Sequence, residues 1–523
     1  MAEPADAQRA TVDALCHSLG AALIETHISY VLLAGGQAWK IKKALDLGFA
    51  DFRTLAQRRF YCDEELRLNR RTAPQLYLRV QPLTGTVQQP VLGGGGTVID
   101  WVLHMRAFEQ DGLWDRLAAR GALGAAQVDA LVEALCALHE AAAIAGEDST
   151  YGTPQHVRAP MSDNLQVLLG TLGETFAALQ PLRAWEQQAF GELQAVFAQR
   201  RRAGRVRECH GDLHLGNVTQ LEGRPVLFDC LEFSADLRWT DVYSDVAFMA
   251  MDLRSHGLDA LSHRFVNAYV ERSGDADGLR VLRYYTVHRA LVRAKVAALR
   301  AAQLADGGGA TRRSLHHYLD VALQSSRPPA PVPVLVLTHG FSGSGKTAAT
   351  QGLLEACGAI RFRADVERKR LFGLDALERS DAARQVLLYS SPASRATHAR
   401  LFERAALALR AGYPVILDAT FLAREPRQQA RALAASLGAR FVLLHFEAGA
   451  DTLRARVRRR ALRGDDASDA GLAVLESQLR QAQPLQDDER EGLVVVDAEA
   501  ELADPASAAR WLPQLQQLGL RST

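Results

Sequence analysis

Residues 334–347 read VLVLTHGFSGSGKT, and this stretch decides the fold of the second half of the chain. The apolar run at its start predicts a buried strand, and the following AATQGLLEA predicts a helix. Between them, Gly340, Gly345, Lys346 and Thr347 fit the pattern GxxxxGK[ST] in the strand–loop–helix setting that this pattern requires. Glycines let backbone N–H groups curl around phosphate oxygens, and the helix N-terminus adds a positive partial charge. The stretch therefore predicts a phosphate-binding loop.

This loop implies a nucleotide and a metal as cofactors, namely ATP and Mg²⁺. Lys346 is expected to reach the β- and γ-phosphates, and Thr347 to ligate Mg²⁺. The predicted nucleotide-binding residues of the loop are Gly340, Ser342, Gly343, Ser344, Gly345, Lys346 and Thr347.

Two further strands predicted in this half end in acidic residues. AIRFRAD ends at Asp365 and opens an Asp-x-x-Arg pair with Arg368, while PVILDAT delivers Asp418. Ligands of open parallel sheets lie beyond the carboxyl ends of the strands, so these residues are expected to face the nucleotide. Asp365 is predicted to accept the proton of an acceptor hydroxyl, Arg368 to steady phosphoryl charge, and Asp418 to bind metal. The half as a whole predicts an α/β domain with a doubly wound parallel sheet.

An arginine-dense helix is predicted over residues 454–463. Arg456, Arg460 and Arg463 follow the spacing i, i+4, i+7 and so share one face of that helix. We predict a lid whose Arg456 and Arg460 close on the transferring phosphate. A solvated basic helix or a nucleic-acid-binding patch is the alternative interpretation.

Residues 334–500 resemble the P-loop kinase group that includes polynucleotide 5′-kinase, gluconate kinase and chloramphenicol phosphotransferase. The Asp-x-x-Arg pair is shared with the first of these. The resemblance implies phosphoryl transfer to a hydroxyl and leaves the acceptor open.

The first half carries its own signature, CHGDLHLGN, at residues 209–217. Asp212 and Asn217 stand five residues apart, as in the catalytic loop of kinases, and the apolar run PVLFD then delivers Asp229. Asp212 is predicted to orient or deprotonate the acceptor, and Asn217 and Asp229 to bind metal. HGDLHxxN followed by an apolar-Asp run resembles the aminoglycoside and choline phosphotransferase family. That resemblance implies an α+β, two-lobed, kinase-like domain.

The same resemblance requires a strand lysine paired with an acid on the next helix. The chain has only six lysines, and AWKIKK places Lys40 and Lys42 on one strand face. Similarity to the family's strands favours Lys40, whereas the VAIK register favours Lys42, so both are predicted nucleotide ligands. The following helix offers Glu64 and Glu65 as partners, with Glu65 the predicted site residue. No glycine-rich GxGxxG loop precedes the lysine strand.

Supporting elements are also expected in the first half. Asp241 and Asp245 resemble the acids that brace the catalytic loop, and His139 is interpreted as a core or capping histidine. Residues 28–105 predict a β-rich lobe, with one hairpin around Gly35-Gly36 and a second with Gly93 to Gly96 at its tip.

Composition sets the outer limits. A hydrophobic content of 48%, a charged content of 23% and a net charge of +1 are ordinary for a globular protein, and argue against a surface built for nucleic acid or membrane. The six cysteines are far apart, the start MAEPADAQRA is no signal peptide, and no apolar run reaches the roughly 18 residues of a membrane helix. We therefore expect a cytoplasmic protein without membrane partners.

A proline-rich linker, RPPAPVP, is predicted at 327–333. It separates a kinase-like domain over 1–326, with a small lobe at about 20–105 and a large lobe at about 106–326, from a P-loop domain over 334–523.

The two halves together resemble a bacterial arrangement described as a bifunctional phosphotransferase/ATP-binding protein. The hypothesis is a phosphotransferase with two ATP sites that acts on hydroxyls of small metabolites. The alternatives are a nucleotide-sensing regulatory protein, or a 5′-hydroxyl nucleic-acid kinase in the second domain. Nucleic acid is the less favoured partner.

Overall fold

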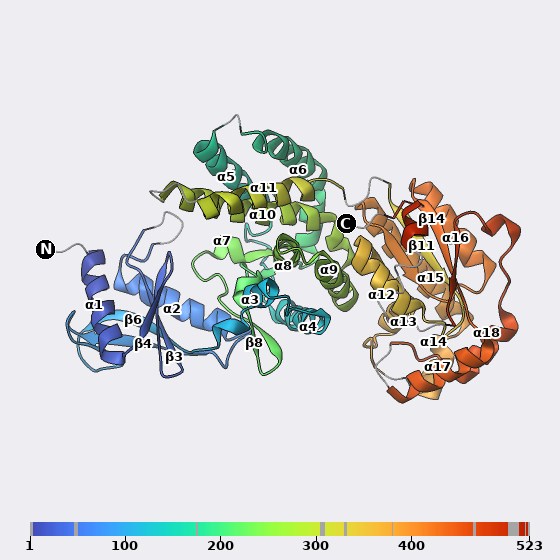
Figure 1. Ribbon diagram of the computed structural model, residues 1–523, viewed down its shortest axis with the longest axis horizontal. Coiled ribbons are helices and arrows are strands. Elements are labelled where there is room, and N and C mark those ends of the chain that lie inside the picture. The colour runs from blue at the N-terminus through green and yellow to red at the C-terminus, as the bar shows by residue number, and fades with distance from the viewer. Residues whose placement is uncertain are drawn as a thin grey trace. The chain divides into compact units, whose positions relative to one another are not determined.

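The computed structural model describes residues 4–46, 51–173, 176–303, 309–328, 332–378, 380–463, 467–499, 512–517 and 519–520. The chain divides into two compact units (Figure 1). The first unit comprises 1–179, 187–252 and 288–315, and the second comprises 180–186, 253–287 and 316–523. No helix among the described residues is long and apolar enough to cross a membrane.

The small lobe of the first unit is a six-stranded sheet in the order β1-β2-β3-β6-β4-β5, with every neighbouring pair antiparallel. Its strands are β1 (Ala22–Glu25), β2 (Ser29–Ala34), β3 (Gln37–Lys42), β4 (Tyr77–Gly85), β5 (Pro90–Leu92) and β6 (Val98–Arg106).

Each face of this sheet packs against a different helix, because successive strand residues point to opposite faces. Val12 and Leu15 of α1 (Pro4–Leu19) join Trp39 and Ile41 of β3 in one apolar cluster. The opposite face carries Ala38 and Leu103 in a second cluster, which packs Leu66 of α2 (Leu55–Asn69). The even-numbered residues of β3 therefore face α2.

The helix α2 begins at a capping box. The Thr54 hydroxyl accepts the Gln57 N–H (3.2 Å) and the Gln57 side chain accepts the Thr54 N–H (3.0 Å). Such a pair satisfies two N–H groups that a helix start leaves without partners.

The predicted hairpin around Gly35-Gly36 is confirmed. β2 and β3 pair with Ala34 opposite Gln37, and the two glycines have φ of 54° and 72°. A two-residue turn with both central residues at positive φ matches the right-handed twist of the strands and favours glycine.

The second predicted hairpin, with Gly93 to Gly96 at its tip, is wrong. β5 pairs with β4, whereas β6 lies between β3 and β4. The glycine segment instead crosses over β4, where a Cβ on Gly94 would lie 2.4 Å from the Thr84 hydroxyl oxygen. Glycine is thus needed here for a close backbone approach, not for a turn.

Helices and short strands follow the sheet between residues 110 and 325. The helical elements are η1 (Gln110–Gly112), α3 (Trp114–Ala119), α4 (Ala125–Ala141), α5 (Pro154–Leu172), α6 (Leu179–Arg202), η2 (Leu215–Asn217), α7 (Ala235–Arg238), α8 (Val242–Ser255), α9 (Asp259–Ser273), η3 (Ala276–Gly278), α10 (Leu279–Gln303) and α11 (Gly309–Ser325). The strands form two antiparallel pairs, β7 (Val206–Glu208) with β10 (Trp239–Asp241) and β8 (Val218–Leu221) with β9 (Arg224–Leu227).

The second unit is built on a five-stranded sheet in the order β12-β13-β11-β14-β15, with all pairs parallel. Its strands are β11 (Val334–His339), β12 (Ile360–Arg363), β13 (Val415–Asp418), β14 (Arg440–Glu447) and β15 (Leu493–Asp497). The first strand in sequence, β11, is fully buried and lies at the centre of the sheet. The strand order therefore reverses at β11, which is where ligands bind in open α/β sheets.

The helical elements that follow β11 are α12 (Lys346–Cys357), α13 (Ala364–Leu371), α14 (Ala382–Leu388), α15 (Ser391–Arg410), α16 (Arg424–Ser436), α17 (Ala450–Arg463), α18 (Leu472–Gln481), η4 (Asp487–Glu489) and α20 (Leu512–Gln517).

The division into units differs from the predicted boundary at 327–333, of which residues 329–331 lie outside the described residues. Residues 253–287 belong to the second unit because α9 packs on α12 and β12. His263 Nδ1 donates to the Glu355 carbonyl (2.8 Å), and the Asn267 side chain accepts the Arg361 N–H (2.7 Å). These contacts join sequence from before the proline-rich stretch to the P-loop sheet.

Candidate active sites

The catalytic-loop signature of the first unit lies on the buried helix α8. The Asp245 carboxylate accepts the backbone N–H groups of His210 (2.8 Å) and Gly211 (3.0 Å), and the Asp252 carboxylate accepts that of Leu215 (2.9 Å). Both acids are at most 2% exposed. The bracing role predicted for Asp245 is therefore present, and Asp252 is a second brace that the sequence interpretation missed.

Asp241 does not brace the loop, contrary to the predicted resemblance. Its carboxylate instead makes two hydrogen bonds with the Arg200 guanidinium of α6, at 2.6 and 2.9 Å. The β7–β10 pairing sets Asp241 opposite Val206, upstream of the loop.

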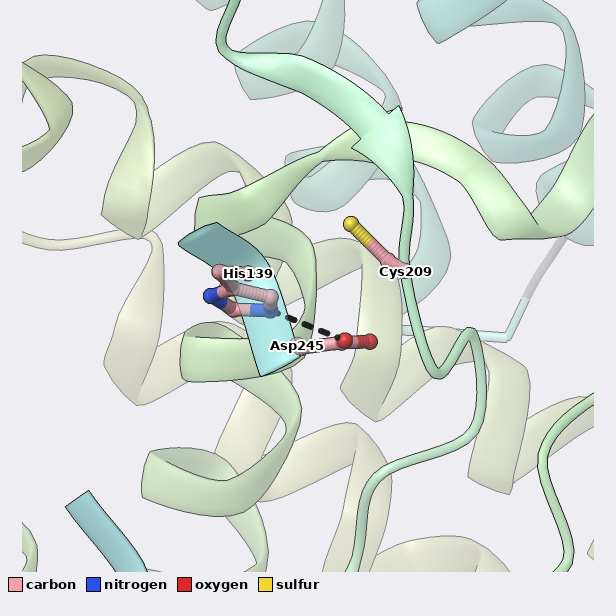
Figure 2. A group of neighbouring side chains, drawn as sticks. All are labelled: His139, Cys209 and Asp245. Atoms are coloured by element: carbon pink, nitrogen blue, oxygen red, sulfur yellow. Dashed lines mark hydrogen bonds and ion pairs between the residues drawn. The ribbon is translucent and has the colours of Figure 1, made fainter. Parts of the chain in front are cut away.

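His139, Cys209 and Asp245 converge beneath the loop (Figure 2). Their ligand atoms lie within 4.8 Å of one another, which is close enough for a metal. Burial, however, raises the pKa of the Cys209 thiol well above its ordinary value, and the thiol donates to the Thr240 carbonyl (3.4 Å). Since metals bind the thiolate, this group fits a structural support of the loop better than a metal site.

Asp212 and Asn217 are brought together by the loop. Asn217 Nδ2 donates to the Asp212 carbonyl (2.8 Å) and to its carboxylate (3.1 Å). Burial alone would raise the pKa of Asp212, but the His214 imidazole, 3.6 Å away, and the Arg289 guanidinium lower it to about 2. Asp212 is thus ionised near neutral pH and able to accept a hydrogen bond from a hydroxyl.

Asp229 follows β9 in an unusual backbone conformation, with φ of 59°. Its N–H donates to Tyr77 Oη (3.1 Å), and its carboxylate accepts from Lys40 Nζ (2.8 Å) while remaining 41% exposed. The predicted metal ligands Asn217 and Asp229 offer amide and carboxylate oxygens, which are the donors that Mg²⁺ prefers.

Both candidate lysines reach Glu65 from β3. Lys40 Nζ lies 2.7 Å from Glu65 Oε1, and Lys42 Nζ lies 2.6 Å from Glu65 Oε2. Lys42 also pairs with Glu232, a residue that the sequence interpretation missed. Burial alone would raise the pKa of Glu65, but the two ammonium groups lower it to about 2. The pairing that was expected for one lysine is shared by two.

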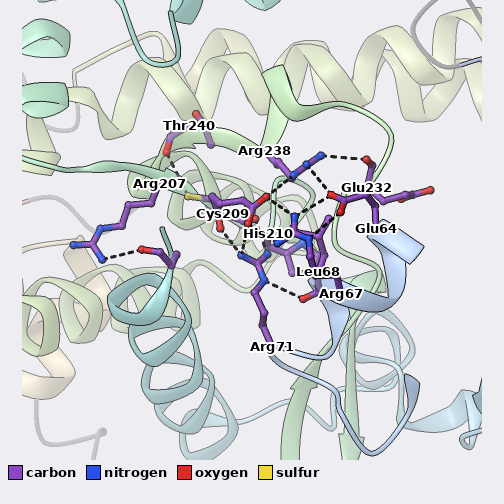
Figure 3. Close-up of polar contacts among 12 residues, drawn as sticks. Glu64, Arg67, Leu68, Arg71, Arg207, Cys209, His210, Glu232, Arg238 and Thr240 are labelled. Atoms are coloured by element: carbon purple, nitrogen blue, oxygen red, sulfur yellow. Dashed lines mark hydrogen bonds and ion pairs between the residues drawn. The ribbon is translucent and has the colours of Figure 1, made fainter. Parts of the chain in front are cut away.

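Glu64, the other candidate partner, belongs to an arginine network in which Arg238 also donates to the Glu232 carbonyl (Figure 3). Its carboxylate accepts from Arg67 (2.9 Å) and Arg238 (3.1 Å), and both of these arginines also bind Glu208 of β7. The network ties α2 to the strand that precedes the catalytic loop.

The phosphate-binding loop of the second unit runs from β11 into α12. Gly340, Gly343 and Gly345 have φ of 149°, 86° and 82°, which L side chains rarely adopt. A Cβ on Gly340 would lie 2.9 Å from the Phe446 carbonyl oxygen, so the loop also needs glycine for close packing. Lys346 Nζ donates to the carbonyls of Gly340 (3.0 Å) and Phe341 (2.7 Å).

A cavity of about 880 Å³ opens at this loop. Of the predicted residues, it is lined by Ser342, Gly343, Gly345, Lys346, Thr347, Asp365, Arg368, Asp418, Arg456 and Arg460, whereas Gly340 and Ser344 are not among its lining residues.

The cavity gathers the strand-end acids that the sequence interpretation selected. Thr347 Oγ1 donates to Asp418 Oδ2 (2.7 Å), so hydroxyl and carboxylate oxygens suited to Mg²⁺ lie together. Asp365 pairs with Arg368 at 2.5 Å. Burial alone would raise the pKa of Asp365, but the Arg368 guanidinium lowers it.

The arginines of α17 have separate partners. Arg456 donates to the carbonyls of Ala498 (2.7 Å) and Glu499 (3.2 Å), whereas Arg460 donates to that of Ala470 (2.7 Å). The side chain of Arg463 lies outside the described residues. Arg459, which the interpretation did not select, also lines the cavity.

Three further lining residues were not predicted. Gln478 Oε1 accepts the Ser342 N–H of the phosphate-binding loop (3.0 Å), and the Tyr389 ring lies under the Arg368 guanidinium, 4.8 Å from the ring centroid. His398 stacks on Phe421, and burial lowers its pKa to about 4. These residues come from α14–α15 and α18, for which the sequence offers no motif.

Family models match both units. A model described as "Phosphotransferase enzyme family" matches residues 56–285, and one described as "AAA domain" matches residues 335–485. The chain thus joins a phosphotransferase-family domain to a P-loop, kinase-like domain.

Two of the similar proteins align with most of this chain. Proteins of Mycobacterium tuberculosis (strain H37Rv) and Mycobacterium bovis, each named an uncharacterized protein, are 30% identical over 446 residues, which is 85% of this chain and 87% of theirs. The chain belongs to their family.

Solved structures of kinases are among those to which the chain is similar. A choline/ethanolamine kinase family protein from Mesorhizobium loti is 14% identical and covers 61% of this chain and 96% of its own, with a TM-score of 0.41. A gluconokinase from Sinorhizobium meliloti is 24% identical and covers 35% and 97%, with a TM-score of 0.25.

Proposed function

We propose that the protein is an ATP-dependent phosphotransferase with two nucleotide sites, each transferring the γ-phosphoryl group to a hydroxyl of a small molecule. The observation that carries this proposal is that each unit assembles a lysine, an oxygen-donor pair suited to Mg²⁺ and an ionised aspartate. Bound Mg²⁺ would neutralise charge that develops on the phosphates.

In the first unit, Asp212 is the residue proposed to meet the acceptor. Its low pKa keeps the carboxylate ionised, so it can orient the hydroxyl and accept its proton as the new P–O bond forms and the bond from the γ-phosphorus to the departing ADP oxygen breaks. Asn217 holds the Asp212 carboxylate by a 3.1 Å hydrogen bond, and Asn217 and Asp229 would hold the metal. Lys40, the more exposed of the two lysines at 11%, is proposed to contact the phosphates.

In the second unit, backbone N–H groups of the phosphate-binding loop and Lys346 would hold the phosphates, and Thr347 with Asp418 would hold the metal. Asp365 is proposed to accept the acceptor's proton, with Arg368 fixing its orientation. A cavity of about 880 Å³ supports a small acceptor, because small-molecule pockets span roughly 300–1,000 Å³.

A second candidate for this unit is 5′-hydroxyl kinase action on nucleic acid. The Asp365–Arg368 pair and the arginines Arg459 and Arg460 on the cavity wall favour it. Transfer of label from ATP to an oligonucleotide 5′ end, weakened by salt, would identify it.

The test is phosphorylation of a metabolite extract by the full chain with γ-labelled ATP. Asp212→Ala and Lys346→Ala should each remove one set of labelled products, and the double variant should remove both. Lys43→Ala is the matched control, because Lys43 directly follows β3 but pairs with Glu25 of β1, away from Glu65 and Asp229. If the double variant keeps all turnover, the proposal is wrong. If the first unit binds ATP but transfers no phosphoryl group, its role is regulatory.

A further inference from the structure

The charged residues of the first site form one alternating chain, in the order Asp229, Lys40, Glu65, Lys42, Glu232. The successive contacts are 2.8 Å, 2.7 Å and 2.6 Å, and Lys42 Nζ closes the chain by binding Glu232. The proposed chemistry needs only one lysine to contact the phosphates and one carboxylate to orient that lysine. Lys42 and Glu232 are therefore additional to the pair that the proposed chemistry uses.

The two ends of this chain differ in exposure. The side chains of Lys42 and Glu232 are 1% and 3% exposed, whereas Lys40 is 11% exposed and Asp229 41%. Lys42 Nζ is enclosed between two carboxylates, so Lys40 and Asp229 form the end that is open to a ligand. The position of Lys42 suits a support, not a contact with nucleotide.

Three residues of the segment from Asp229 to Glu232 contact the small lobe, whereas the Leu231 N–H donates to the His210 carbonyl (3.0 Å). The Asp229 N–H donates to Tyr77 Oη of β4 (3.1 Å), and the Cys230 N–H donates to Asn69 Oδ1 of α2 (2.8 Å). The Glu232 carboxylate then accepts from Lys42 of β3. Asp229 has a positive φ, and such a conformation persists only where its surroundings enforce it.

We propose that Lys42 and Glu232 are positioning residues that hold the Asp229 segment against the small-lobe sheet, so that Asp229 and Lys40 are aligned before Mg²⁺-nucleotide binds. This inference rests on the function proposed for the first site. Without the Glu232 charge, Lys42 would keep Glu65 as its only carboxylate and draw it away from Lys40. Lys40 would then turn fully to Asp229, where it competes with the metal.

Glu232→Gln in the full chain tests this, with Glu25→Gln as the control. Glu25 also pairs with a lysine next to β3, Lys43, but its side chain is 44% exposed. Amide hydrogen exchange of the ligand-free protein should be at least about ten-fold faster at Cys230 in Glu232→Gln and unchanged in Glu25→Gln. This readout does not depend on nucleotide. Unchanged exchange at Cys230 would overturn the inference even if no activity were found.

Measurements of nucleotide binding distinguish a positioning role of Glu232 from a general loss of structure. In a Lys346→Ala background that silences the second site, Glu232→Gln should weaken Mg²⁺-ATP binding at the first site about ten-fold and weaken metal-free ATP binding clearly less, because only the Mg²⁺ complex needs Asp229 as well as Lys40. Equal weakening of both would overturn the inference.

A second variant, Lys42→Met, should act through the same pair. The double variant Lys42→Met/Glu232→Gln should then bind Mg²⁺-ATP no more weakly than the weaker-binding of the two single variants, because the effects of substituting interacting residues are not additive. Additive losses would also overturn the inference. Absence of any ATP binding by the wild-type first site would contradict the proposed function instead, and the exchange result would still stand.

Discussion

The two candidate sites assemble their polar groups in different ways. The first collects side chains from positions as far apart as Lys40 and Asp229, and holds them by buried ion pairs. The second uses one continuous loop, whose glycines aim backbone groups, and adds acids from the ends of neighbouring strands. A site made of backbone is local in sequence, whereas a site made of ion pairs exists only once the lobe has folded.

The largest effect is expected at the two aspartates that we propose to meet the acceptor hydroxyls. Asp212→Asn should lower first-site turnover about 10³-fold, within the range of general-base catalysis, and leave second-site products unchanged. Asp365→Asn should lower second-site turnover to a similar extent and leave first-site products unchanged. Steady-state rates for each product in the full chain would check this. Loss of both products from one substitution would mean that the sites do not act separately.

A smaller effect is expected at the proposed metal ligands of the second site. Thr347→Val removes the hydroxyl that lies 2.7 Å from Asp418, and should lower second-site turnover about 10²-fold at low Mg²⁺. Because the loop's backbone groups remain, metal-free nucleotide binding should be nearly unchanged. Titration with Mg²⁺ would show the difference. Thr350→Val is a control on the same helix, since the Thr350 hydroxyl does not line the cavity: it donates to the Lys346 carbonyl (2.9 Å) and accepts from Arg361 (3.1 Å).

The pH dependence of stability should reveal that the loop of the first site is held by a charged residue, Asp245. Burial alone would raise the pKa of Asp245, but His139 lowers it from 3.8 to about 2. A lowered pKa contributes stability that is present above about pH 4 and is lost as the pH falls towards 2. Asp245→Asn should therefore cost about 2 kcal/mol at pH 7, and the difference from wild type should shrink between pH 4 and pH 2.

Thermal unfolding over this pH range would measure the effect, with the exposed Asp63→Asn as control. In the second unit the corresponding contact is uncharged: the Thr338 hydroxyl of β11 accepts the Ala419 N–H at 3.0 Å. This contact should therefore add no pH dependence to stability over the same range. A cost at Asp245 that stays constant down to pH 2 would contradict the charge-based account.

The smallest effect concerns the loop's own hydrogen bond. Gln478 Oε1 accepts the Ser342 N–H, and so competes with a phosphate oxygen for that donor. Gln478→Ala should tighten nucleotide binding at the second site about five-fold, which corresponds to one hydrogen bond of about 1 kcal/mol. Calorimetric titration would detect this, with Gln481→Ala from the same helix as control. Weaker binding would show that Gln478 helps to hold the nucleotide.

Prediction from sequence worked best where a single short segment carries the chemistry. The loop around Lys346 and the catalytic segment at Asp212 were recognisable because each keeps its residues within a dozen positions. The hairpin at Gly93 to Gly96 was wrong because glycine serves both turns and close crossings, and only the neighbouring strand decides which. The membership of residues 253–287 likewise depends on side chains of α9 that meet α12, for which no local pattern exists.

The sequence by itself determined the two phosphotransferase signatures and the residues within them, because backbone geometry and residue spacing are local properties. The tertiary structure alone decided which of two lysines is the more exposed, that Glu232 pairs with Lys42, and that Asp252 accepts from the loop at Leu215 while Asp241 pairs with Arg200. Those outcomes depend on burial and on charges brought together from distant segments, and the energy of a buried ion pair has no counterpart in the unfolded chain.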